Sequence, residues 1–185
     1  MRIKLLSKRY ATAVFDLAVE FKILEKVNDD LKLVSKVFAE NRELRVIIAN
    51  PTIDTHKKIG ILNKLFDGKV QELTIKFLRL ITNKGREQYI SYISDAFYDI
   101  YKDYKNILSV KLTTASTADK VISDGISKKL KEATKMNIEM TEKVNEELIG
   151  GFVVNFEDYK YDASIINQLN RLKKSFSDNL YETQI

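Results

Sequence analysis

Apolar and polar residues repeat with two different periods along this chain of 185 residues. Up to about residue 105 the apolar positions recur every three or four residues, which predicts amphipathic helices. After residue 106, short runs alternate between apolar and polar residues, which predicts strands. The pattern therefore predicts a mainly α protein, in which an N-terminal six-helix bundle (1–105) is followed by a small α+β module (106–185).

The six expected helices are short and separated by brief loops, which is typical of a bundle. Their expected ranges are 7–21, 24–40, 42–49, 55–66, 70–82 and 87–105. Ser7 is expected to cap the first helix, and Asp54 or Thr55 the fourth, because short polar side chains accept from free N–H groups there. Asp67-Gly68 is expected to end the fourth helix, since glycine readily adopts the C-cap conformation.

The first and fifth helices carry more apolar residues than a surface helix needs. At about 100° per residue, their apolar arcs are roughly 200° and 220° wide, against about 100° for packing on one core. Two interpretations follow from these arcs. Each helix lies in the middle of the bundle, or each presents a second apolar face to a partner helix.

The second half opens with alternating residues at 108–113, which predict a strand, followed by a helix that ends at about Lys135. Ser116 and Asp119 have the spacing of a helix N-cap box. The helix is expected to bury four apolar residues, Ile122, Ile126, Leu130 and Ala133. Gly125 within it costs on the order of 1 kcal/mol relative to alanine, which predicts a close packing contact there.

Two more strands are expected around a pair of glycines. The runs 138–141 and 152–157 alternate, and Gly150-Gly151 lies just before the second. A glycine pair at the start of a strand permits a positive φ or the close approach of another backbone. The glycines precede a strand and match no phosphate-binding motif, so they do not indicate a nucleotide site.

The last helix is expected to begin at a cap formed by Asp162. Its apolar residues form a narrow stripe, namely Ile165, Leu169, Leu172, Phe176 and Leu180. Packing of this stripe on the small sheet is the favoured interpretation. The alternative is a coiled-coil seam that faces a partner, because the spacing of four and three residues is the same.

The stretch 138–157 resembles the C-terminal signature of the ATP synthase delta subunit family, which includes the mitochondrial oligomycin-sensitivity-conferring protein. The resemblance rests on Val144-Asn145 followed by Leu148-Ile149-Gly150-Gly151 and an alternating apolar run. Two further stretches resemble motifs of the same family, Arg9-Tyr10-Ala11-x-Ala13-Val14-Phe15 and Leu80-x-x-Asn83-x-Gly85-Arg86. Glu157 and Ala163 depart from the glycines that the family often has at these positions.

The resemblance implies a non-catalytic stator subunit that links the catalytic head of a rotary ATP synthase to its membrane sector and resists torque. In that family the first and fifth helices hold the N-terminal helix of an alpha subunit, and the C-terminal half binds the b-type stalk subunits. By position, the resemblance assigns the alpha-subunit groove to Tyr10, Ala13, Val14 and Leu80. Homo-oligomers are not expected.

Composition adds little to this function and leaves one alternative. The net charge of +5 comes from 31 basic and 26 acidic residues spread along the chain, which favours an ordinary solvated surface. A basic helical nucleic-acid-associated protein is the alternative, motivated by the isoelectric point of about 9.1. The basic start lacks the apolar region of a signal peptide, and no apolar run reaches the roughly 18 residues of a membrane span. We expect a peripheral protein on the cytoplasmic side of a bacterial membrane.

Catalysis, metal binding and cofactors are not expected. The chain has no cysteine, and its one histidine, His56, lies in a polar run at a helix start. One imidazole without thiols does not form a His/Cys metal site. The paired acids Asp29-Asp30 and Glu146-Glu147 are sequence neighbours, which do not face each other on a helix.

Overall fold

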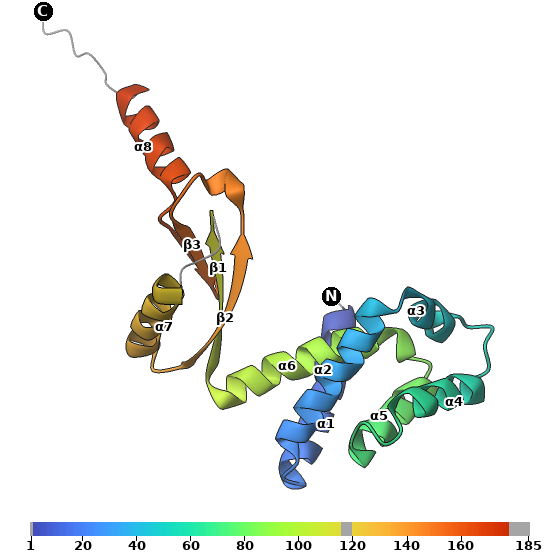
Figure 1. Ribbon diagram of the computed structural model, residues 1–185. Coiled ribbons are helices and arrows are strands. Elements are labelled where there is room, and N and C mark those ends of the chain that lie inside the picture. Colours follow the sequence, from blue (N-terminus) through green and yellow to red (C-terminus); the bar gives the residue numbers. More distant parts are fainter. Residues whose placement is uncertain (1, 116–119, 178–185) are drawn as a thin grey trace, which may run out of the picture. The chain divides into compact units, whose positions relative to one another are not determined.

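The computed structural model describes residues 2–115 and 120–177 (Figure 1). The chain divides into two compact units, 1–104 and 105–185. The first is helical and the second combines helices with a sheet, as the two hydrophobic periods predict. The mainly α fold with a small α+β C-terminal module is therefore confirmed.

The described part of the first unit contains six α-helices and one 3₁₀ turn. They are α1 (Arg2–Glu20), α2 (Leu24–Glu40), α3 (Arg42–Ala49), α4 (Thr55–Phe66), α5 (Glu72–Asn83), η1 (Glu87–Tyr89) and α6 (Ile90–Lys105). Large apolar side chains from α3 to α6 fill the core, namely Ile48, Leu62, Phe66, Leu78, Ile81, Ile90, Ile93 and Phe97. These residues follow the helical period of the apolar positions, so they lie on the inward faces of their helices.

Helix starts depend on contacts that sequence shows only in part. Asp54 caps α4 as predicted, accepting from the His56 N–H at 2.8 Å. Ser7 does not cap α1, because residues 2–6 continue the helical pattern and place Ser7 inside the helix, where it is buried. The start of α5 is joined to α2: the Asp30 carboxylate accepts from the Gln71 N–H at 2.7 Å and from the Thr74 hydroxyl at 2.8 Å.

Two further polar contacts join helices inside the first unit. Lys58 of α4 forms an ion pair with Glu87 of η1, and both side chains are almost fully buried. The Tyr101 hydroxyl of α6 donates to the Glu25 carboxylate of α2. The charges of Lys58 and Glu87 are buried, and each requires a partner to offset its lost hydration, so this pair fixes how α4 packs against η1.

The second unit is built on a four-stranded sheet with the order β2-β1-β3-β4. Its elements are β1 (Ile107–Thr114), α7 (Lys120–Thr134), β2 (Asn137–Val144), η2 (Glu146–Leu148), β3 (Phe152–Phe156), β4 (Tyr159–Asp162) and α8 (Ile165–Ser177). β1 and β2, which are connected by α7 in the sequence, pair in parallel. β3 pairs antiparallel with both β1 and β4. Leu108, Val110, Leu112 and Val154 form the centre of its core.

Several predictions for this unit are wrong in detail. The sheet has a fourth strand, β4, which is only four residues long and gave too short an alternating pattern. Ile126 and Leu130 pack on the core as expected, but Ala133 is exposed, although it lies on the same helix face seven residues after Ile126, because it is in the last turn of α7. A Cβ at Gly125 would meet nothing within 4 Å, so no close packing contact explains that glycine. The Ser116–Asp119 box and the Ile122 side chain lie outside the described residues.

Candidate partner-binding surfaces

The wide apolar arc of α1 is divided between the core and the surface. Ala11, Val14, Phe15 and Ala18 are buried, so they account for the inward part. Tyr10, Ala13 and Leu17 recur at the spacing of one helix face, and they are half-buried, exposed and 40% exposed. The bundle therefore does not enclose α1, and the helix presents a second apolar face to solvent.

The apolar arc of α5 is divided in a similar way. Phe77, Leu78 and Ile81 are buried, whereas Leu80 is 48% exposed. Leu80 therefore points away from the core and contributes little to it, although its neighbours on the same helix are buried. Leu80 is therefore available to a partner, as Ala13 is on α1.

Tyr10 connects α1 to the turn that follows α5. Its hydroxyl accepts a hydrogen bond from Arg86 Nη1 at 2.7 Å, and the Arg86 guanidinium lies 5.5 Å from the centre of the Tyr10 ring. Gly85, with a φ of 63°, makes the turn that brings Arg86 to this position. The contact holds together the two helices to which Tyr10, Ala13 and Leu80 belong.

Val14 differs from the other three residues assigned to this groove. It is only 3% exposed and packs inside the bundle. Its side chain supports the outward residues from beneath and offers almost no surface of its own. Leu17, which is 40% exposed on the same face as Tyr10 and Ala13, was missed, although its spacing from Tyr10 shows it.

The two glycines of the signature are explained by different contacts. A Cβ on Gly150 would lie 2.5 Å from Ile165 Cδ1, and a Cβ on Gly151 would lie 2.3 Å from the Ala163 carbonyl oxygen. Gly151 also has a φ of 76°, which side chains disfavour. Both features expected of a glycine pair, the positive φ and the close approach of another backbone, occur here.

The other two signature residues form the turn before these glycines. Leu148 ends η2 and is half-buried, and Ile149 is 66% exposed with a φ of 62°. A branched residue at a positive φ is strained, so the surrounding turn holds it in place. Asn145 begins that turn by accepting from Glu147 N at 3.1 Å.

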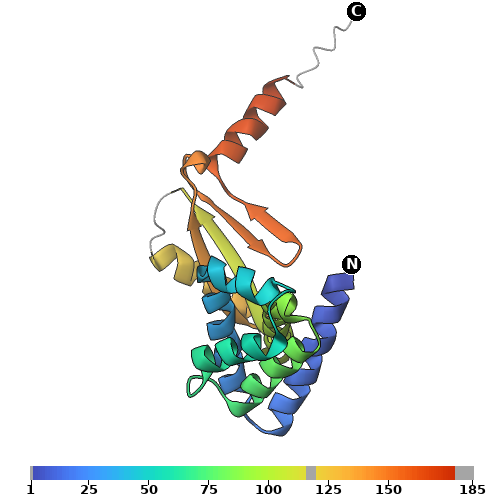
Figure 2. The ribbon, with the colours of Figure 1, turned by 90° about the vertical axis from the view of Figure 1, so that its right-hand side faces the viewer.

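The apolar stripe of α8 is exposed. Its described members are Ile165, Leu169, Leu172 and Phe176, which are 42%, 51%, 54% and 76% exposed. The favoured interpretation, packing on the sheet, is therefore wrong. Figure 1 and Figure 2 show why, since α8 continues beyond the end of the sheet instead of lying across it. Leu180 lies outside the described residues.

The cap of α8 also differs from the prediction. Ser164, not Asp162, lies before the first turn, and its hydroxyl accepts from Asn167 N at 3.3 Å. Asp162 instead accepts from the Ser164 hydroxyl at 2.6 Å and from the Ser164 N–H at 3.1 Å. These hydrogen bonds, the Ser164 hydroxyl first, lower the pKa of Asp162.

Within residues 2–115 and 120–177, no group of three or more potential ligands could hold a metal ion. The two neighbouring acids Asp29 and Asp30 differ in environment, since Asp30 is buried and accepts from the Gln71 N–H while Asp29 is exposed. No helix among the described residues has the length and apolar character needed to cross a membrane.

Comparison with known sequences identifies one family over almost the whole chain. The sequence model of the ATP synthase delta (OSCP) subunit matches residues 6–176. ATP synthase subunit delta of Cytophaga hutchinsonii is 33% identical over 93% of this chain and 94% of its own length. The protein of the same name from Lachnoclostridium phytofermentans is 34% identical over 98% of both chains.

Comparison with solved structures agrees on the fold. A chain of the mitochondrial ATP synthase hexamer of Toxoplasma gondii superposes with a TM-score of 0.73 at 21% identity, covering 95% of this chain and 99% of its own. The fold, the family match and the relatives cover both units. The chain therefore belongs to the ATP synthase delta (OSCP) subunit family, a family of structural stalk subunits and not of catalytic ones.

Proposed function

We propose that the chain works as a stator by binding a different partner with each of its two units. The central shaft of a rotary ATP synthase exerts torque on the catalytic head, and the head turns unless it is held. An adaptor resists this torque when one surface binds the head and another binds the stalk. The exposed apolar helix faces on α1 and on α8 support this arrangement, because each unit has one.

The first unit would bind the N-terminal helix of an alpha subunit. Tyr10, Ala13 and Leu17 of α1, together with Leu80 of α5, form the contact surface, with Val14 beneath them. Small Ala13 permits close helix approach, and Tyr10 is held in place by Arg86. Apolar burial at such positions lowers the dissociation rate, which a stator needs in order to stay bound during turnover.

The second unit would bind the C-terminal end of the b-type stalk subunits through α8. Its exposed apolar residues Ile165, Leu169, Leu172 and Phe176 are spaced by four, three and four residues. This is the spacing of a coiled-coil seam, in which side chains insert between those of a facing helix. The coiled-coil alternative left open by the sequence is thus the one that the exposure of α8 supports.

The complex would place the chain at a bacterial cell membrane. Both relatives described above are bacterial proteins named as ATP synthase subunit delta. The chain would be a peripheral protein on the cytoplasmic side, bound through its partners. It needs no membrane segment of its own for this role.

Two peptide titrations on the full chain test the proposal. One peptide is the N-terminus of the alpha subunit and the other is the C-terminal end of a b-type stalk protein, both from the same organism. Leu80→Asp is expected to weaken binding of the alpha peptide at least about tenfold and leave binding of the stalk peptide unchanged, because it places a charge in an apolar contact. Leu172→Asp is expected to do the reverse. Each variant is thus the control for the other.

The result that rejects the proposal is equally specific. If the folded Leu80→Asp and Leu172→Asp variants bind both peptides as the unchanged chain does, these faces are not the binding surfaces. A random DNA duplex controls for association through net charge alone, whose affinity falls steeply with salt. Binding to the duplex that exceeds binding to the peptides would favour the nucleic-acid alternative.

A further inference from the structure

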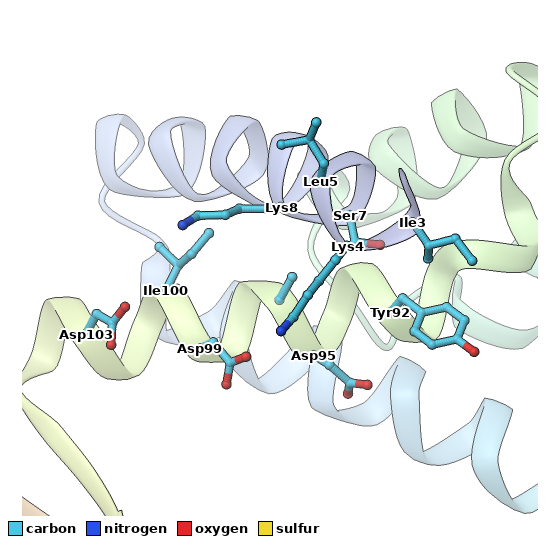
Figure 3. Close-up of a pocket in the computed structure, with 11 residues that line it drawn as sticks. Ile3, Lys4, Leu5, Ser7, Lys8, Tyr92, Asp95, Asp99, Ile100 and Asp103 are labelled. Atoms are coloured by element: carbon cyan, nitrogen blue, oxygen red, sulfur yellow. The ribbon is translucent and has the colours of Figure 1, made fainter. Parts of the chain in front are cut away.

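A second groove lies on the first unit, between α1 and α6, and it is distinct from the α1–α5 surface. It encloses about 770 Å³ and is open to solvent. Figure 3 shows its residues in two rows, one from α1 and one from α6. Ile3, Ala96 and Ile100 supply apolar lining, and Tyr92 is 56% exposed at its side. A pocket of this volume is large enough for a ligand or for several side chains of a partner.

The two walls of the groove carry opposite charges. The α6 wall has Asp95, Asp99 and Asp103, spaced by four residues and so about 6 Å apart along the helix axis. The α1 wall has Lys4 and Lys8, also spaced by four. Within the described residues, the only ion pair made by these five side chains joins Asp99 to Lys102 of its own helix.

Asp95 is the carboxylate of the α6 wall whose charge is least well stabilised, because it forms no ion pair within the described residues. Burial raises the pKa of Asp95, and the neighbouring Asp99 carboxylate raises it further. A cation placed along this wall would relieve that repulsion. The charges therefore favour a partner that carries basic groups on the side facing α6.

The groove also contains a buried polar group without a partner among the described residues. Ser7 lines the groove, is 2% exposed, and its Oγ makes no hydrogen bond to them. In Figure 3 its side chain lies on the side of α1 that faces α6. Buried hydroxyls normally have a partner, so this hydroxyl is available to an occupant of the groove.

We propose that the α1–α6 groove binds a second amphipathic helix, one with an apolar ridge, basic residues along the flank facing α6 and acidic residues along the flank facing α1. A helix laid along α6 repeats its own side chains every four residues at the same interval of about 6 Å. Its basic side chains would therefore meet Asp95, Asp99 and Asp103 in register. This inference does not depend on either partner named in the proposed function.

Three synthetic helices, each about five turns long, test this inference by titration against the full chain. All three share one apolar ridge. The first has lysine along one flank and glutamate along the other, the second has glutamate along both, and the third has lysine along both. The mixed helix is expected to bind one-to-one and at least about tenfold more tightly than either uniform helix, because only it complements both walls.

Two charge reversals locate the binding site. Asp99→Lys is expected to remove the preference for the mixed helix. Asp16→Lys is the matched control, because Asp16 is an exposed aspartate on α1, nine residues after Ser7 and thus on the opposite side of that helix. It is expected to leave the preference unchanged.

The inference is overturned by any of three results. The mixed helix fails to bind, it binds no better than the uniform helices, or Asp16→Lys weakens it as much as Asp99→Lys does. Leu80→Asp provides a further check on location. If this variant abolishes binding of the mixed helix, the helix occupies the α1–α5 surface, and the α1–α6 groove is not its site.

Discussion

Ile165, the first residue of α8, occupies the space that any side chain at Gly150 would need. A Cβ at Gly150 would lie 2.5 Å from Ile165 Cδ1, and Ile165 N donates to the Gly150 carbonyl oxygen at 3.0 Å. Ala163 N also donates to the Phe152 carbonyl oxygen at 2.9 Å. The glycine pair therefore sets where α8 begins, and with it the position of the exposed apolar stripe.

Gly151→Ala is expected to destabilise the second unit by about 3 kcal/mol. The added Cβ would clash with the Ala163 carbonyl at 2.3 Å, and the φ of 76° is unfavourable for alanine. Urea unfolding and hydrogen exchange of β1 and β3 would measure the effect. Gly68→Ala is the matched control, with a φ of 71° but nothing within 4 Å, and should cost only about 1 kcal/mol. Equal costs for the two variants would contradict the role of the clash.

Gly125→Ala is expected to stabilise the protein by up to about 1 kcal/mol. Gly125 lies in α7, is exposed, and has free space around its Cα for a methyl group. Alanine restricts the unfolded chain more than glycine does and has the higher helix propensity. Thermal unfolding would show a rise in the melting temperature. A fall would mean that the glycine has a packing role that the structure does not show.

Lys58→Met is expected to destabilise the first unit by about 3 kcal/mol or more. The substitution leaves the Glu87 carboxylate buried without its cation, and one of its oxygens, Oε2, already has no hydrogen-bond partner within the described residues. Lys76→Met is the control, since it removes an ion pair with Glu72 that is exposed to solvent and should change the free energy of unfolding far less.

A double substitution distinguishes the effect of the buried charge of Glu87 from the effect of how the Lys58 side chain packs. Lys58→Met combined with Glu87→Leu should recover most of the stability lost in Lys58→Met, because no uncompensated charge then remains. Urea unfolding of all the variants gives the comparison. No recovery in the double variant would show that packing of the lysine chain, and not its charge, matters at this position.

Stability of the first unit is expected to fall between about pH 10 and pH 12. Burial, followed by the hydrogen bond to Glu25, raises the pKa of Tyr101 from 10.0 to about 12. The folded state holds this proton more tightly than the unfolded state. The stabilisation is therefore complete below the unfolded pKa and is lost as the pH rises through the folded one.

Tyr101→Phe is the variant that tests this pH dependence. It should lower stability near neutral pH by about 1 kcal/mol, because the hydrogen bond is lost. It should also flatten the fall above pH 10, since the group that titrates is gone. Urea unfolding at several pH values would show both effects, and Tyr92→Phe, at an exposed position, is the control. An unchanged alkaline slope in Tyr101→Phe would rule out Tyr101 as its source.

Local sequence patterns predicted helices, strands and turns well where the structure depends only on residues that are close together in the sequence. The Asp54 cap, the alternating strands and the glycine pair were all visible, because each depends on neighbours in sequence. Ser7 shows the limit of such reasoning. Its type suits a helix cap, but the apolar and basic residues before it extend the helix past that position.

Surfaces were harder to predict than elements, because exposure depends on which helices meet. The spacing of apolar residues showed that the apolar arc of α1 is wide, but it did not show that Val14 is buried and Ala13 is exposed. Tyr10 and Arg86 are 76 residues apart in sequence, so only the folded bundle brings them together. The three spaced aspartates of α6 are also visible in the sequence, but the sequence does not show that Lys4 and Lys8 of α1 lie across a groove from them.

The division of the chain at residue 104 has a consequence for biosynthesis. The core of the first unit is built from residues 1–104, so its folding does not require the sheet of the second unit. Domains of this kind generally fold from the N-terminus as the ribosome releases them. The faces of α1, α5 and α6 are therefore complete before α8 has been translated, and partners can be recruited in that order.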